Sequence, residues 1–266
     1  MCPLDGDVLE RAENSWRCAH GHSFDIARQG YVNLLPVQNK RSKDPGDSKA
    51  MVQARQRFLD KGSYQPVADA LATQLFDLNL SSLLDAGCGE GYYLRRIVQH
   101  AEAQQTPLAV AGLDISKWAV MAAARRDSRL TWLVASNAAI PLAGASVDAV
   151  LCVFGFPVAD EFRRVLRPGG KLLMIDPGPA HLIELKQIIY SDIKPKPDHT
   201  PALDGGFSKI AEHVISFPFE LTRHDDILDL LTMTPHLYRA SSEGRAAVSD
   251  LDQLKLTADV RLRIYQ

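Results

Sequence analysis

The sequence predicts an α/β fold, in which a mostly parallel sheet is covered on both faces and preceded by a small amino-terminal module. Three observations carry this prediction. A glycine-rich turn follows a short apolar run at 83–91, apolar strands alternate with helical segments from residue 67 onward, and residues 1–38 differ in composition from the rest. The chain has 266 residues, 46% of them hydrophobic, which is ample for a packed core. We divide it into a module at 1–38, a linker and helix at 39–66, and a main domain at 67–266.

The amino-terminal module has too few large apolar residues to form a core by itself, so it needs a cross-link or a metal. Cys2, Asp5, Cys18 and either His22 or His20 offer ligands with the spacing of a zinc site, although Asp5 stands where such sites usually have cysteine. Zinc is one expectation. The alternative is a small β-ribbon packed on the main domain, with Cys18 as an ordinary buried thiol.

The segment at 39–66 is expected to be a polar loop followed by a helix that begins near Lys49 and ends at Gly62. It carries an excess of positive charge, which favours a phosphate backbone, although a solvated helix face is the commoner meaning of such a run. Its basic residues up to position 57 are Lys40, Arg41, Lys43, Lys49, Arg55 and Arg57.

The main domain alternates helices and strands, as a parallel sheet with helical crossovers requires. Strands are expected at 82–85, 108–114, 130–135, 147–153 and 171–176, the last after a Pro-Gly-Gly turn at 168–170. Helices are expected at 66–76, 92–103, 117–126 and 159–165. The tail is expected to hold a helix at 180–191, an insertion or lid at 194–206, a strand at 217–223, a helix at 226–231, and a final strand at 254–264 on the antiparallel edge.

The turn after the first of these strands indicates a ligand. Gly87, Gly89 and Gly91 alternate, which lets the backbone pass close beneath a ligand. Asp85 precedes them, and a carboxylate there suits an amine-bearing cation such as S-adenosylmethionine (SAM). A dinucleotide fingerprint requires glycine where the chain has Tyr92. The alternative is a glycine-rich turn without a ligand.

Two further residues follow neighbouring strands, whose carboxyl ends line the ligand crevice in such sheets. Asp114 is expected to accept both ribose hydroxyls, and Asn137 to reach the adenine edge. Asp160, Glu161, Asp176 and His181 are candidate bases near the same edge, of which His181 follows a rigid Pro-Gly-Pro lead. Each also has a structural alternative, as a turn, helix-dipole or surface residue.

The residues that follow the strand expected at 147–153 limit the chemical classes of methyl acceptor. Val153-Phe154-Gly155-Phe156-Pro157 replaces the Asp/Asn-Pro-Pro-aromatic run of enzymes that methylate exocyclic amines. Cys152 lies inside the apolar strand, which indicates a core thiol rather than a nucleophile. A ring nitrogen, an oxygen or a small molecule remains as the acceptor.

Bulk properties exclude other classes. The formal net charge of −2 means that any nucleic-acid contact is local. No apolar run approaches the length that spans a bilayer, and the first residues lack a basic-then-apolar leader pattern. Four cysteines do not suggest a disulfide scaffold. We expect a reduced, cytoplasmic protein without a membrane partner.

Taken in order, long runs of the chain resemble the bacterial large-subunit (23S) ribosomal RNA (guanine-N1)-methyltransferases, which are related to macrolide-resistance methyltransferases. The runs that carry the resemblance are 22–25, 30–36, 44–48, 58–60 with Tyr64, 87–93, 177–182, 184–186 and 233–235.

This resemblance implies a Rossmann-like class I SAM-dependent methyltransferase domain with an amino-terminal zinc-ribbon-like module, often as a homodimer. Positions Tyr64, Gly89, Glu90 and His181 match residues that contact SAM in the family, which favours cofactor contact over a base role for His181. Positions Cys2, Cys18 and His22 match zinc ligands, whereas Asp5 departs from a cysteine, and Phe154-Gly155-Phe156-Pro157 departs from a usual Tyr-Ala-Pro-Cys.

The implied activity is methyl transfer from SAM to N1 of a guanine in a hairpin of 23S rRNA, held by the amino-terminal module and the basic segment. Two alternatives stay open. One is a small-molecule methyltransferase of the quinone or sterol type, and the other is an RNA-binding protein that retains SAM without turnover. The catalytic base is not identified.

Overall fold

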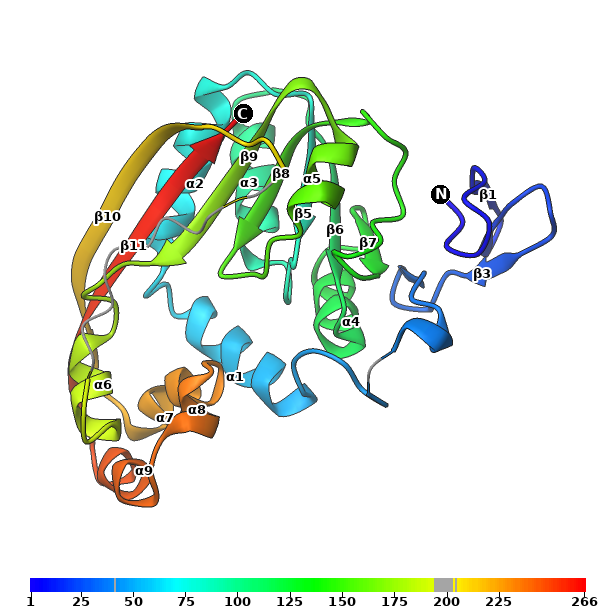
Figure 1. Ribbon diagram of the computed structural model, residues 1–266. Coiled ribbons are helices and arrows are strands. Elements are labelled where there is room, and N and C mark those ends of the chain that lie inside the picture. Colours follow the sequence, from blue (N-terminus) through cyan, green and yellow to red (C-terminus); the bar gives the residue numbers. More distant parts are fainter. Residues whose placement is uncertain (41, 194–202, 204) are drawn as a thin grey trace.

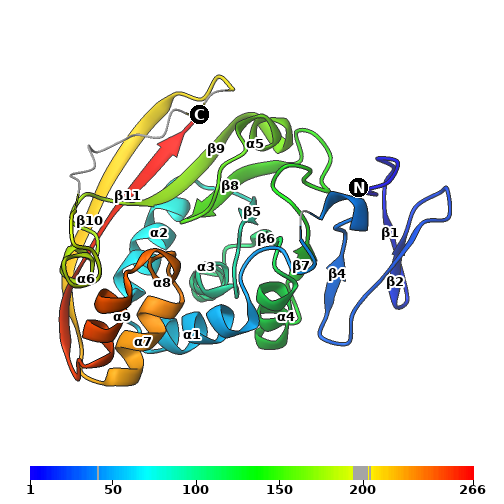
Figure 2. The same cartoon turned by 60° about the horizontal axis from the view of Figure 1, so that its bottom comes forward.

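The protein is built on one large sheet with a small sheet docked beside it (Figures 1 and 2). The computed structural model describes residues 1–40, 42–193, 203 and 205–266. The small sheet has the order β1-β2-β3 and the large one β10-β11-β9-β8-β5-β6-β7-β4. The small-sheet strands are β1 (Glu10–Ala12), β2 (Ser15–Arg17) and β3 (Ser23–Asp25). The large-sheet strands are β4 (Tyr31–Asn33), β5 (Ser82–Ala86), β6 (Ala109–Asp114), β7 (Thr131–Val134), β8 (Val147–Val153), β9 (Leu166–Pro177), β10 (Lys209–Leu221) and β11 (Leu254–Tyr265).

Helices connect and cover these strands. Several begin at side chains that accept the first free amide: Ser48 accepts from Met51 N, and Ser116 from Ala119 N. The helices are η1 (Val37–Asn39), α1 (Lys49–Asp60), α2 (Gln65–Asp77), α3 (Tyr92–Ala103), α4 (Lys117–Arg126), α5 (Ala159–Val165), α6 (Ile183–Ile189), α7 (His224–Thr232), α8 (His236–Arg239) and α9 (Ser242–Ser249). None in the described part of the chain is long and apolar enough to cross a membrane.

The sheet separates two hydrophobic cores, because successive side chains of a strand point to opposite faces. On one face, residues such as Leu83 and Leu151 pack with α1 to α4 and with the helices of the tail. On the other, Leu84 and Cys152 pack with α5 and with the amino-terminal module, which buries its two cysteines there. The module therefore covers part of one sheet face. The expectation that Cys152 is a core thiol is confirmed.

The predicted parallel core is confirmed, with β4 to β9 running parallel. The expectation that the final strand forms the edge is wrong. β11 lies between β9 and β10, antiparallel to both, and β10 is the edge strand. The strand expected at 217–223 begins at Lys209. Twelve residue pairs join it to β11, so the pairing extends far beyond its most apolar end.

Other boundaries differ locally. β9 runs through the expected turn at 168–170, and α6 begins only at Ile183, because Leu182 takes a left-handed conformation with a φ of 51°. The helices α8 and α9 were not expected. The insertion or lid expected at 194–206 falls largely outside the described residues.

Candidate active site and metal centre

The glycine turn lies at the carboxyl end of β5, where β6 adjoins it (Figure 2). All three glycines have positive φ, at 94°, 56° and 78° for Gly87, Gly89 and Gly91. Gly91 immediately precedes α3, and a Cβ there would lie 2.5 Å from Trp132 Cη2. Glycine is thus required at this position by both backbone conformation and packing. We call this turn, residues 87–91, the cradle, because its backbone allows close approach of a ligand.

Asp85 points a carboxylate into this buried region. It is 2% exposed, and among the described residues its Oδ1 has no hydrogen-bond partner. Burial, with a smaller contribution from the nearby Asp114 carboxylate, raises the pKa of Asp85 to about 8. A buried carboxyl without a partner is costly, so this residue fits a ligand that brings a positive charge.

Asp114 closes the cradle from the end of β6. Its Oδ2 accepts from Gly89 N at 2.9 Å and its Oδ1 from Ser116 N at 2.8 Å. Burial raises its pKa, and these two amide donors oppose that rise. The side chain therefore holds the turn in place. Its expected contact with ribose hydroxyls stays a prediction.

Glu90 is 2% exposed and lies beside two arginines. Its Oε2 is 3.3 Å from Arg95 Nη2 and 4.0 Å from Arg126 Nε, while its Oε1 has no partner among the described residues. Burial raises the pKa of Glu90, and the two guanidinium groups oppose the rise. The Oε2 atom of Glu90 is thus held by the two guanidinium groups, and its Oε1 atom can accept a hydrogen bond from a ligand.

Tyr64 and His181 come together from opposite sides of the site, with Tyr64 Oη 3.2 Å from His181 Nε2. His181 Nδ1 accepts from Asp259 N at 3.2 Å, so the imidazole proton lies on Nε2 and is donated to Tyr64 Oη. Burial, assisted by Lys186, lowers the pKa of His181 to about 4. The neutral imidazole has its acceptor nitrogen occupied, which argues against a role as base. Its contact with SAM stays a prediction.

Asn137 links the cradle to the residues that follow β8. Its Nδ2 donates to Phe156 O at 3.2 Å and lies 3.5 Å from Ala86 O. Its Oδ1 is buried without a partner among the described residues, and is thus available to an amino group. The expected contact with adenine stays a prediction.

Two of the other candidate bases are already engaged. Glu161 accepts from Ile140 N at 2.7 Å and pairs with Arg164, which holds its pKa below the usual range. Asp176 lies 3.5 Å from Arg263, and burial raises its pKa. Both serve structural contacts, which leaves the catalytic base unassigned.

Sequence reasoning gave Arg55 only as a basic residue, whereas the structure places it over the cradle. Its Nη1 lies 3.7 Å from the position that a Cβ on Gly89 would occupy, and it pairs with Asp47. Its Nη2 donates to Met233 O at 3.1 Å. Arg55 therefore joins α1 to the segment after α7 and lies against the glycine turn. No local pattern in the sequence reports such contacts.

The basic segment is less available to RNA than its charge suggests. Arg57 binds Asp229 through two bonds, at 2.9 and 2.5 Å, and Lys49 lies over the Trp118 ring at 5.8 Å. Arg55 is engaged as described, and Arg41 is outside the described residues. Lys43 is exposed to solvent, and Lys40 is partly so.

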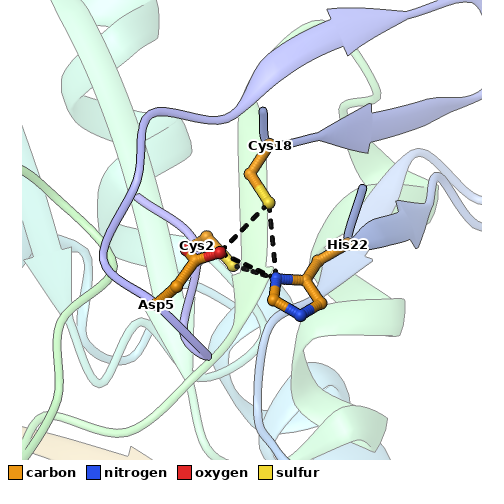
Figure 3. Close-up of side chains that lie close together, drawn as sticks. All are labelled: Cys2, Asp5, Cys18 and His22. Atoms are coloured by element: carbon orange, nitrogen blue, oxygen red, sulfur yellow. Dashed lines mark hydrogen bonds and ion pairs between the residues drawn. The ribbon is translucent and has the colours of Figure 1, made fainter. Parts of the chain in front are cut away.

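The candidate metal ligands converge at one point in the amino-terminal module (Figure 3). His22 Nδ1 lies 3.5 Å from Cys2 Sγ, 3.4 Å from Cys18 Sγ and 2.8 Å from Asp5 Oδ2. In a tetrahedral zinc site with the usual bond lengths, neighbouring sulfur and nitrogen ligands are about 3.6 Å apart. The histidine grouped with both cysteines is His22, whereas His20 lies 2.7 Å from Asp7 and 3.4 Å from Asp5.

The donor set suits zinc, with two sulfurs, an imidazole nitrogen and a carboxylate oxygen. Hydrogen bonding, with Cys2 the largest contributor, holds the pKa of Asp5 well below its usual range. Asp5 thus supplies the charge that a cysteine thiolate would supply. The Asp5 substitution leaves the geometry of a four-ligand site intact.

Comparison with known proteins supports both the expected amino-terminal module and the expected methyltransferase domain. Residues 1–43 match the zinc-ribbon family described as RlmA, N-terminal, and residues 83–170 match the family described as methyltransferase domain. A Micromonospora griseorubida protein, provisionally named 23S rRNA (guanine-N(1)-)-methyltransferase, is 35% identical over all of this chain and 96% of its own. The chain belongs to the 23S rRNA (guanine-N(1)-)-methyltransferase family.

Two other relatives of this family agree. YxjB of Bacillus subtilis, provisionally given the same name, is 30% identical over 99% of this chain and 95% of its own. The 23S rRNA (guanine(748)-N(1))-methyltransferase of Streptomyces fradiae is 39% identical over 69% of this chain and 65% of its own. The resemblance inferred from the motifs is thereby confirmed, as are the class I methyltransferase fold and its amino-terminal zinc ribbon.

SAM fits the residues of the cradle in this family member. Oxygen atoms of Asp85, Glu90 and Asn137 are buried without partners in the described part of the chain, and all three border the positive-φ glycines. They offer acceptors for an ammonium group and for hydroxyl or amino donors, all of which SAM carries.

Proposed function

We propose that this protein transfers a methyl group from SAM to N1 of a guanine in a hairpin loop of 23S rRNA. The proposal rests on the occurrence of three features in one chain. A cradle with an unpartnered buried carboxylate and a four-ligand metal site occur in a chain whose full length aligns with guanine-N1 methyltransferases of rRNA.

SAM, when bound, supplies a methyl group that is already activated as a sulfonium. The protein's residues then have to bind and orient. Asp85 would hold the ammonium of the methionine part, and Asp114 the ribose. Tyr64 accepts a hydrogen bond from His181, so its hydroxyl keeps its own proton for a ligand atom. Phe58, Phe154 and Phe219 surround the Tyr64 ring and exclude water.

The acceptor requires a proton to leave, because N1 of guanine is protonated at neutral pH. An unpaired loop base can be turned out of its stack into such a site. The zinc ribbon and the exposed lysines of the 39–66 segment would hold the surrounding RNA. We infer that the protein acts in the cytoplasm, and as a homodimer.

Primer extension on rRNA tests this function. Loss of one reverse-transcription stop in a strain that lacks the gene, and its return with the purified enzyme, SAM and a synthetic hairpin, is the expected result. Nucleoside mass spectrometry should identify 1-methylguanosine. Unchanged stops with altered metabolites would instead support a small-molecule substrate. Unchanged stops with altered ribosome assembly would support an RNA-binding role without turnover.

A further inference from the structure

Phe156 is an apolar side chain left in solvent beside the methyl-transfer site. It is 89% exposed, more than other exposed large hydrophobic residues such as Val37 at 79% and Val214 at 62%. Burying a phenylalanine is favourable, and a single exposed one needs no explanation by itself. Its position beside the site and the contacts that hold its backbone distinguish Phe156 from an ordinary exposed apolar residue.

The backbone that presents Phe156 is fixed at several points. Phe154 N donates to Ile175 O at 2.8 Å, and Asn137 Nδ2 donates to Phe156 O at 3.2 Å. A Cβ on Gly155 would meet Cys152 Sγ at 2.8 Å, so the chain is pressed against β8. The exposed ring thus rests on an ordered support.

Phe154 adds a strained anchor. It has a φ of 52°, which is uncommon for a residue other than glycine and persists where its surroundings hold it. Its ring stacks on His181, with centroids 5.9 Å apart and planes at 28°. Phe154, two residues before the exposed ring, is therefore fixed to the Tyr64–His181 pair.

The same Asn137 amide also reaches the cradle. The Asn137 amide that holds Phe156 O is 3.5 Å from Ala86 O and 4.0 Å from the position of a Cβ on Gly87. Phe156 thus meets the cofactor side through its backbone carbonyl, while its ring stays in solvent. This arrangement leaves the ring to a second ligand rather than to the adenine of SAM.

We propose that Phe156 is a stacking platform for an unpaired base of the rRNA loop. The inference rests on the proposed function and deepens it, because it names a residue that holds an unpaired base of the loop. Sequence-specific RNA proteins stack splayed loop bases on exposed aromatic rings, and such stacking tolerates any base because each has a π-face. The platform positions the loop beside the methyl donor.

The test compares Phe156→Ala, Phe156→Leu and Phe156→Trp with Val214→Ala, which removes an exposed apolar side chain from the edge strand β10. Anisotropy measures affinity for the hairpin, calorimetry measures affinity for S-adenosylhomocysteine, and melting temperature checks folding. Alanine should weaken RNA binding roughly 5- to 150-fold. Leucine should recover little of this loss and tryptophan most of it. Cofactor affinity and the Val214→Ala protein should match wild type.

Two results would overturn the platform while the proposed function stands. One is a Phe156→Ala enzyme that binds and methylates the hairpin like wild type. The other is a loss of S-adenosylhomocysteine affinity with RNA affinity unchanged, which would place the ring over the cofactor. A wild-type protein that methylates no rRNA hairpin would remove the proposed function itself, and the platform with it.

Discussion

Binding of the cofactor should release a proton from Asp85. The pKa of this carboxyl is about 8 in the ligand-free protein, because burial disfavours its charged form. At pH 7 about nine tenths of the molecules therefore carry a proton there. An ammonium group binds the ionised form, so that proton must leave when the cofactor enters.

The size of the effect follows from the same pKa. Between pH 6 and pH 7 an α-amino group stays largely protonated, so the carboxyl is the group whose charge changes. The ionised fraction then rises about ninefold, and affinity should rise by about the same factor. Replacing Asp85 by asparagine should remove this slope and weaken binding roughly 10- to 150-fold at pH 7, as expected for a charged hydrogen bond.

Calorimetry with S-adenosylhomocysteine in buffers of different ionisation enthalpy counts the protons released. Asp77→Asn, at an exposed position at the end of α2, serves as the matched control and should keep both the release and the slope. A flat affinity from pH 6 to pH 7 with no proton release in wild type would refute the reasoning, because Asp85 would then be ionised before binding or stay protonated after it.

The raised pKa of Asp85 also predicts how the stability of the folded protein changes with pH. Between the ordinary carboxyl pKa and about 8, the folded protein holds a proton that the unfolded chain releases, so the stability of the ligand-free protein falls as pH rises. Asp85→Asn should therefore raise the melting temperature at pH 8 without cofactor while it weakens cofactor binding. A variant that loses both would point to general damage.

Three further outcomes are expected. The purified protein should hold one zinc per chain by elemental analysis, and Asp5→Cys should tighten it against a competing chelator, because a thiolate is a softer ligand than a carboxylate. Gly91→Ala should cost several kcal/mol in chemical denaturation, since its Cβ would lie 2.5 Å from a buried indole, whereas Gly169→Ala, with similar φ and nothing within 4 Å, should cost about 1 kcal/mol. Lys43→Gln should lower the salt slope of rRNA binding by about 0.7 to 0.9, while Arg57→Gln, whose guanidinium is already paired, should leave it unchanged.

Each of these has a contrary result. Absence of zinc in protein purified without chelators would leave the ribbon to be held by packing alone. Equal losses at the two glycines would mean that backbone conformation, rather than the indole contact, decides the cost. An equal change of salt slope at Arg57 would show that its ion pair opens to meet phosphate.

Much of the parallel core could be predicted because its determinants are local. Apolar runs mark β5 to β8, and the glycine turn with Asp85 marks the ligand edge. The order of the last strands could not be predicted, since the place of β11 between β9 and β10 depends on pairing between residues far apart in the chain. β4 has three residues, too few to show a period.

The candidate site likewise has a part that the sequence predicts and a part that it does not. The place of Asp114 could be predicted, because it directly follows an apolar strand. The tautomer of His181 depends on Tyr64, 117 residues away, and on the Asp259 amide, 78 residues away. The position of Arg55 above the cradle likewise depends on Asp47 and Met233 together. Residue types predicted which groups could bind a ligand. Only the fold shows which hydrogen-bond and ion-pair partners fix their protonation and position.

The strand β4 joins the ribbon to the catalytic sheet in a way that matters for anyone who would exchange recognition modules between relatives. Tyr31, Val32 and Asn33 hydrogen-bond alongside β7 as the eighth strand of the catalytic sheet, yet the ribbon family match runs to residue 43. If the chains are joined between β3 and β4, the catalytic domain keeps β4. If they are joined after β4, the sheet loses this strand and the backbone of Thr131–Val134 becomes an exposed edge. Chimeras should therefore be joined before residue 31.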